Sequence, residues 1–91
     1  MDEMDKIVEK GLLFDFYGPL LTEHQQKIYK EVILDDYTLS EVAEDEGISR
    51  QSVHDLIKRC DRQLEDYEKK LGLVSRFQQI QQKIREIQDI L

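Results

Sequence analysis

Residues 38–57 read TLSEVAEDEGISRQSVHDLI, and this stretch decides the fold. Thr38, followed three residues later by Glu41, has the pattern of a capping box, in which the two side chains bind the first backbone N–H groups of a helix. A short helix is therefore predicted over residues 39–46. A second helical pattern begins almost immediately after it, so the two helices must be joined by a tight turn.

The turn between these helices has its own steric requirements. Gly47 adopts without penalty the positive φ that a reversal within a few residues needs, and Ser49 is a preferred N-cap for the helix that follows. Ala43 has the small side chain that lets two steeply crossed helices approach closely. The stretch is predicted to be a helix-turn-helix, whose shared apolar core consists of Leu39, Val42, Ile48, Val53, Leu56 and Ile57.

The apolar spacing predicts helices in the rest of the chain too, and no stretch has the alternation typical of a β-strand. A first helix is expected over residues 4–17, because a Gly-Pro pair follows it. Thr22 and Gln25 form a second capping box, which starts a helix closed by the Asp-Asp pair at 35–36.

Two longer helices are predicted after the turn. The fourth helix starts at Ser49, and its apolar residues follow steps of four and three up to Gly72. These residues are Val53, Ile57, Cys60, Leu64, Tyr67 and Leu71. A second four-three series is out of register with the first, so Gly72 is expected to be a bend. The second series consists of Leu73, Phe77, Ile80, Ile84, Ile87 and Leu91.

The expected fold is all-α, a helix-turn-helix bundle with a long fourth helix and a C-terminal heptad-patterned helix. We expect a helix-turn-helix domain over residues 1–72 and an amphipathic helix over residues 73–91. Full burial of a large apolar side chain stabilises by about 1.5–3 kcal/mol, so this last helix is expected to form a homodimer, with packing inside one chain as the alternative. The dimerisation residues would be Phe77, Ile80, Ile84, Ile87 and Leu91.

The charge distribution is uneven. The net charge of −7 argues against indiscriminate attraction to nucleic acid, which depends on clustered cations. Residues 1–48 hold 13 acidic and 4 basic side chains, whereas residues 49–91 hold 7 acidic and 9 basic ones. The basic half therefore begins at the second helix of the predicted motif. No secretion signal or membrane span is visible and the one cysteine cannot form an internal disulfide, so a cytoplasmic protein is expected.

No catalytic or metal site is expected. Cys60 falls on the apolar series of the fourth helix, where a buried, unreactive thiol is expected. His24 and His54 should be exposed, and His54 should diverge from its neighbour Asp55, so neither histidine joins a set of metal ligands. No glycine-rich loop precedes a lysine in the pattern that holds phosphates. We expect a protein that is not an enzyme and binds no cofactor or metal.

The outer face of the fourth helix is the candidate nucleic-acid-binding surface. The N-terminal residues of the second helix of a helix-turn-helix meet base edges in the major groove, where Ser, Arg, Gln and His form hydrogen bonds. Residues 49–62 hold four basic side chains against the acids Asp55 and Asp61, so phosphates can be contacted too. The candidate residues are Ser49, Arg50, Gln51, Ser52, His54, Lys58, Arg59 and Arg62.

Four segments carry a family resemblance: residues 20–25, 35–43, 47–55 and 64–73. The helix-turn-helix resembles region 4 of RNA polymerase sigma factors. The wider chain resembles the YlxM-like family of small bacterial proteins associated with the signal recognition particle, which implies a regulatory role linked to co-translational protein targeting. The chain departs from the pattern at His54, where a tyrosine is expected, and in its acidic third helix, which disfavours phosphate contact there.

Two functions remain open on the sequence alone. The leading hypothesis is a regulatory nucleic-acid-binding protein, with DNA and RNA both open as targets. The alternative is a protein–protein adaptor that uses the helix-turn-helix as a scaffold. Its acidic face at residues 41–46 would then meet a basic protein of the targeting or transcription machinery.

Overall fold

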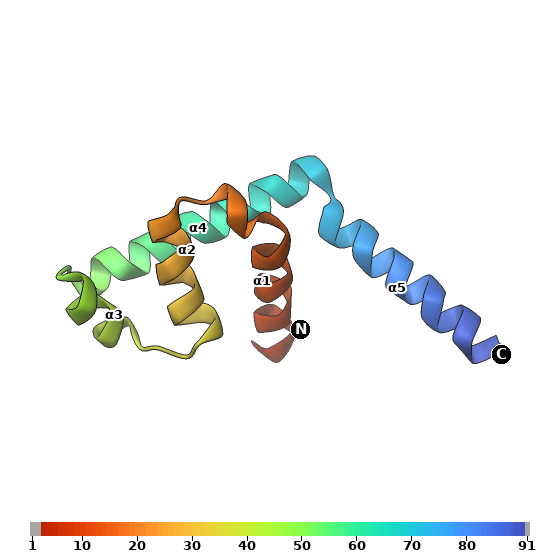
Figure 1. The fold of residues 1–91 in the computed structure, drawn as a ribbon, viewed down its shortest axis with the longest axis horizontal. Helices are drawn as coiled ribbons and strands as arrows, with labels where there is room; N and C mark the ends of the chain where they lie inside the picture. The colour runs from red at the N-terminus through yellow and green to blue at the C-terminus, as the bar shows by residue number, and fades with distance from the viewer. Residues whose placement is uncertain (1–2, 91) are drawn as a thin grey trace.

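The computed structural model describes residues 3–90, and every regular element within that range is helical. This confirms the all-α fold. The elements in chain order are α1 (Glu3–Tyr17), η1 (Gly18–Leu20), α2 (Glu23–Tyr29), η2 (Lys30–Leu34), α3 (Leu39–Glu46), α4 (Arg50–Leu71) and α5 (Leu73–Ile90). In Figure 1, α1, α2 and α3 pack at successive positions on one side of α4, while α5 leaves the bundle after a bend. Leu91, predicted to take part in dimerisation, lies outside the described residues.

The predicted helix starts are confirmed in detail. The backbone N–H of Gln25 donates to Thr22 Oγ1 at 3.1 Å, and the N–H of Thr22 donates to Gln25 Oε1 at 3.0 Å. Thr38 and Glu41 make the same reciprocal pair at the start of α3. Gly47 ends α3 in the left-handed region, with φ 68°, as expected for a glycine in a tight turn.

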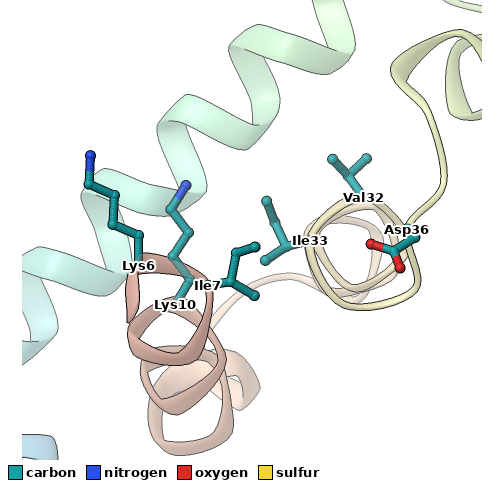
Figure 2. A pocket seen from close by; sticks show the side chains of 6 residues that line it. All are labelled: Lys6, Ile7, Lys10, Val32, Ile33 and Asp36. Carbon is teal, nitrogen blue, oxygen red and sulfur yellow. The ribbon is translucent and has the colours of Figure 1, made fainter. Parts of the chain in front are cut away.

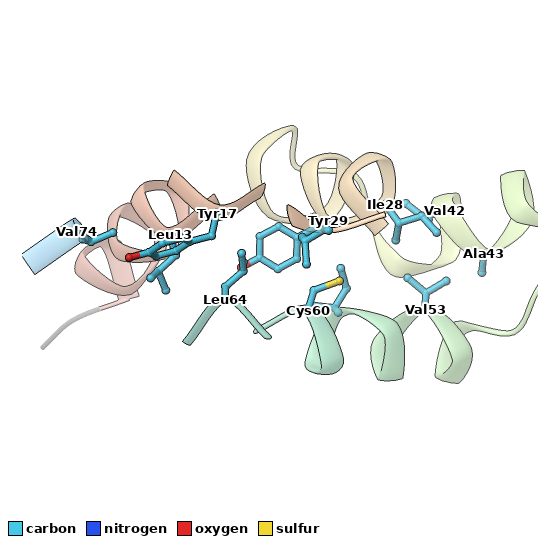
Figure 3. Close-up of a cluster of buried hydrophobic side chains, with 12 residues drawn as sticks. Leu13, Tyr17, Ile28, Tyr29, Val42, Ala43, Val53, Cys60, Leu64 and Val74 are labelled. Atoms are coloured by element: carbon cyan, nitrogen blue, oxygen red, sulfur yellow. The ribbon is translucent and has the colours of Figure 1, made fainter. Parts of the chain in front are cut away.

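The core is one continuous cluster between α4 and the helices that cover it (Figure 3). Ile28 and Tyr29 of α2 are fully buried, as are Val42 of α3 and Val53 of α4. The remaining members are Leu13, Tyr17, Leu21, Ala43, Ile57, Cys60, Leu64 and Val74. Because α4 contributes four of these residues along about three turns, it is the helix on which the others assemble.

Ile48, predicted to be in the core, is exposed, and so is Leu71, the last residue of the apolar series of the fourth helix. Ile48 is 39% exposed, because the turn is held by its backbone N–H, which donates to the Ala43 carbonyl at 3.0 Å, and not by its side chain. Leu71 is 52% exposed, because it is the last residue of α4 and the chain turns away at Gly72. Of the other predicted core residues of the motif, Leu39 and Leu56 are half-buried against the core.

The second helix has an irregular end that the sequence pattern did not indicate. After Tyr29 the backbone widens into the π-helical turn η2, in which the N–H of Asp35 donates to the Lys30 carbonyl at 3.0 Å. Asp36 then adopts φ 61°, a left-handed conformation that aspartate tolerates better than most residues. The expected closure at the Asp-Asp pair is confirmed.

The bend at Gly72 is confirmed and is reinforced by side chains. Gly72 has φ 64°, and its N–H donates to the Glu68 carbonyl at 2.8 Å. The buried Tyr17 hydroxyl donates to Glu68 Oε1 at 2.6 Å and accepts the N–H of Leu73 at 3.0 Å. The same carboxylate accepts the N–H groups of Val74 and Ser75 at 3.0 and 3.1 Å, so it caps α5.

Candidate nucleic-acid interface

The N-terminal half of α4 presents one buried and one exposed face. Val53, Ile57 and Cys60 are buried against the other helices and Leu56 is half-buried, whereas the other side chains between them are exposed. All eight predicted nucleic-acid-binding residues are exposed: Ser49, Arg50, Gln51, Ser52, His54, Lys58, Arg59 and Arg62. The helical period that builds the core therefore sets these side chains on the solvent side of the second helix of the motif.

The lysine, arginine and histidine side chains of this face form what we call the basic strip: Arg50, His54, Lys58, Arg59 and Arg62. Four of the five line one shallow hollow together with Asp55, and Arg50 lines an adjoining one with Leu39, Gln51 and His54. Within residues 3–90, none of its lysine or arginine side chains is found in an ion pair. By contrast, Lys10 and Lys27 are both paired with carboxylates.

The two acids that interrupt this segment have different positions. Asp61 turns toward the bundle, where its Oδ1 accepts the Tyr29 hydroxyl at 2.8 Å and its Oδ2 lies 3.5 Å from Lys10 Nζ. Burial, together with this hydrogen bond, raises the pKa of Tyr29 well above its usual value, so the hydroxyl remains a donor. Asp61 is therefore withdrawn from the basic strip, which makes the strip more positive than the sequence count indicates.

Asp55 stays on the strip, contrary to part of the sequence expectation. Its Oδ1 accepts Gln51 Nε2 at 2.9 Å and lies 3.8 Å from His54 Nδ1. The expectation that His54 and Asp55 diverge is wrong, because adjacent exposed side chains on a helix can lean toward one another. Both histidines of the chain are exposed, as predicted.

The two serines at the start of α4 serve the helix itself. Ser49 Oγ accepts the N–H of Ser52 at 3.0 Å, and its hydroxyl donates to Ser52 Oγ at 2.9 Å. Ser49 is thus the N-cap that the sequence predicts. The hydroxyl proton of Ser52 is not used in this pair. Ser52 is therefore the serine better placed to donate a hydrogen bond to a phosphate.

The acidic side chains of α3 divide into two groups. Glu46 bridges to α2, accepting Lys27 Nζ at 2.7 Å and lying 3.0 Å from His24 Nε2. The hydrogen bonds from Lys27 and His24 lower the pKa of the Glu46 carboxyl. The other acids of α3 line an exposed hollow beside the Tyr37 ring: Glu41, Glu44 and Asp45.

Other candidate chemistry finds little geometric support. Cys60 is buried, and burial followed by the nearby Asp61 charge raises the pKa of its thiol to about 11, which keeps it protonated. Across the described part of the chain, no three His, Cys, Asp or Glu side chains gather as a metal site would require. None of the helices described there is long and apolar enough to cross a membrane.

One hollow was not predicted from the sequence. It lies between α1 and η2, where Ile7 faces Ile33, and its lining is completed by Val32, Lys6, Lys10 and Asp36 (Figure 2). Its volume is about 300 Å³, and it is open to solvent. The sequence could not predict this hollow, because its shape depends on how the π-helical turn positions η2 against α1.

Comparison with known proteins agrees with a helix-turn-helix fold. The family model described as "Putative helix-turn-helix protein, YlxM / p13 like" (UPF0122) matches residues 4–91. A UPF0122 protein of Symbiobacterium thermophilum is 44% identical over 88 residues, covering 97% of this chain and 82% of the relative. One of Caldanaerobacter subterraneus is 48% identical over 87 residues, covering 96% and 74%. The chain therefore belongs to the UPF0122 family of YlxM- and p13-like helix-turn-helix proteins.

Proposed function

We propose that this protein is a regulatory nucleic-acid-binding protein that uses α4 as its recognition helix. The observation that carries the proposal is the basic strip, whose lysine and arginine side chains form no ion pair with any residue in the range 3–90, on an otherwise acidic chain. Unpaired cations on one helix face can release counterions from phosphates at no cost in broken salt bridges.

The first turn of α4 and the later part of the basic strip are proposed to contact different parts of the nucleic acid. Arg50 and Gln51 stand in the first turn of α4, the position from which a recognition helix reaches base edges. Arginine pairs with guanine and glutamine with adenine through two hydrogen bonds each. Lys58, Arg59 and Arg62 follow about two to three turns later, where phosphate contacts fix the register of the helix on the duplex.

A titration tests this function. The full chain is titrated into fluorescently labelled random duplex DNA and into a structured RNA of the signal recognition particle, each at two salt concentrations. We expect saturable binding that weakens with salt. Arg50→Ala should weaken it roughly several-fold and reduce the slope of log affinity against log salt concentration by about 1, as the loss of one phosphate contact would. Lys30→Ala, which removes an exposed cation outside the strip, is the matched control and should change affinity little.

The pattern of results also separates the targets. Binding to the RNA arm alone would support the link to protein targeting that the family resemblance implies, and binding to the duplex arm alone would support transcriptional regulation. Equal losses of affinity for Arg50→Ala and Lys30→Ala would reject α4 as the recognition helix. Absence of binding in both arms would reject the proposal.

A second candidate function is a protein adaptor, favoured by the exposed acids of α3. Glu41, Glu44 and Asp45 surround a hollow beside Tyr37, an arrangement that suits a basic protein segment with one aromatic or aliphatic side chain. If the nucleic-acid titration is negative, binding of a lysine-rich peptide that is abolished by Glu44→Lys, but not by Glu23→Lys on α2, would support the adaptor.

A further inference from the structure

Two helices carry apolar faces that the bundle does not cover. On α5, Ile80, Ile84 and Ile87 are 52%, 50% and 58% exposed, although they continue the side of the helix that begins at Phe77. On α1, Val8 is 58% exposed and lies two turns before Phe16 on the same side. Contiguous exposed apolar side chains of this kind mark interaction surfaces.

These faces meet at a common corner. The rings of Phe16 and Phe77 pack edge to face with centroids 5.4 Å apart, so the apolar side of α5 starts against the apolar side of α1. Beyond this contact the two helices diverge, and Figure 1 shows α5 running away from α1. Val8 and Leu12 lie on the α1 side of this divergence and the isoleucines on the α5 side, and we call these two diverging apolar faces together the notch.

The corner fixes how far the notch is open. Four hydrogen bonds join Tyr17 and Glu68 to each other and to the backbone N–H groups of the first turn of α5. Tyr17 is 1% exposed, and Val74 beside it is 4% exposed. Closing α5 onto α1 within one chain would have to break these contacts, so the exposed faces need a partner from outside the chain.

We propose that the notch of one molecule receives α5 of a second copy, in a two-fold dimer in which each α5 lies between α1 and α5 of the other chain. This surface is separate from the basic strip on α4, and the proposal does not depend on nucleic-acid binding. A two-fold arrangement uses both the notch and the helix of each copy, so the contact closes without leaving a free end.

Charge complementarity favours a second copy as the occupant. Arg76 and Lys83 flank the isoleucine face of α5 on one side, one turn before and after Ile80. Glu9 adjoins Val8 on α1, in the stretch that a partner helix would cover. An α5 laid along the α1 of the other copy therefore brings basic side chains to an acidic edge while the apolar faces meet. The 18-residue α5 extends about 27 Å, longer than the 15-residue α1 along which it would lie.

Sedimentation of the full chain, without nucleic acid and across a concentration series, tests this dimer. The wild-type chain should be a dimer that dissociates on dilution. Ile84→Glu should raise the dissociation constant on the order of 100-fold or more, because each dimer would bury the charge twice. Gln82→Glu places the same charge on the opposite, polar side of α5 and should leave the constant nearly unchanged. Circular dichroism of both variants checks that the helices remain formed.

A charge reversal distinguishes this arrangement from a dimer held by α5 alone. Glu9→Lys and Lys83→Glu should each weaken the dimer about fivefold, and the double variant should recover most of the loss. A chain that is monomeric at every concentration overturns the proposal. So does a dimer that is sensitive to Ile84→Glu while the two charge reversals act independently, because α1 would then take no part.

Discussion

The two long amphipathic helices, α4 and α5, have nearly the same apolar spacing and opposite surroundings. In α4 the spacing buries four side chains, Val53, Ile57, Cys60 and Leu64, whereas in α5 only Val74 is buried. The other three α-helices all precede α4, and all three pack against it, whereas α5 contacts α1 and α4 and is buried only at its start, at Val74. The apolar spacing therefore predicts that one face of each helix is an interaction surface. Whether that face is buried inside the same chain depends on the position of the other helices.

The two helices also begin differently. Ser49 caps α4 from the position immediately before it, a local arrangement. The cap of α5 is the Glu68 carboxylate, which is part of α4 and is itself held by Tyr17 of α1. A local cap can form as soon as its helix does, whereas this one requires three helices to be in place. The angle of α5 is consequently a property of the folded bundle.

The largest expected effect is a difference in stability between two alanine substitutions, one on the apolar face of α4 and one on the apolar face of α5. Leu64→Ala empties a fully buried site and should lower the free energy of unfolding by about 2–5 kcal/mol. Ile84→Ala, measured where the protein is monomeric, should change it by about 0.5 kcal/mol or less, since the side chain is half-exposed. Urea unfolding followed by circular dichroism measures both. Similar losses for the two variants would mean that α5 is packed within one chain.

A smaller effect is expected at the corner that joins the two helices. Tyr17→Phe removes the hydroxyl that links Glu68 to the N–H of Leu73, leaving a part-buried carboxylate and a backbone donor short of a partner. The free energy of unfolding should fall by about 1–3 kcal/mol. Tyr37→Phe, which removes an exposed hydroxyl, is the control and should be nearly neutral. Equal, small changes for the two variants would show that the corner does not hold α5.

Much of the helical bundle follows from local patterns, and the corner does not. The capping boxes at Thr22 and Thr38, and the left-handed Gly47, were predicted because each depends on residues at most three positions apart. The contact of Tyr17 with Glu68 joins residues 51 positions apart, and no spacing rule connects them. The same limit applies to the site: the strip could be predicted from one helix, but the withdrawal of Asp61 toward Tyr29 could not.

The pH dependence of stability should also distinguish the corner from the rest of α4. Burial raises the pKa of the Glu68 carboxyl, but hydrogen bonds from Tyr17, Val74 and Ser75 outweigh it and leave the pKa below its usual value. A depressed folded-state pKa stabilises the fold above the unfolded-state pKa, and this contribution is lost as pH falls through the folded-state value. The stability difference between wild type and Glu68→Gln should therefore shrink on acidification.

Glu65→Gln is the matched control for that experiment, because Glu65 is an exposed carboxylate of the same helix. Its difference from the wild type should show no comparable loss over the same acidic range. Chemical unfolding at a series of pH values measures both differences. A Glu68→Gln difference that is constant with pH would show that the carboxylate charge does not contribute to the cap of α5.

The smallest expected effect concerns the solvent face of α4 and follows from the proposed function. Asp55→Asn removes the one negative charge that remains on the basic strip, while the amide oxygen can still accept the Gln51 hydrogen bond. Affinity for nucleic acid should rise roughly threefold, a gain of the size expected from one exposed charge. Asp89→Asn makes the same change in net charge on α5 and should have a smaller effect. If the affinity of both variants rises equally, the increase reflects the net charge of the chain, and α4 does not contact the nucleic acid directly.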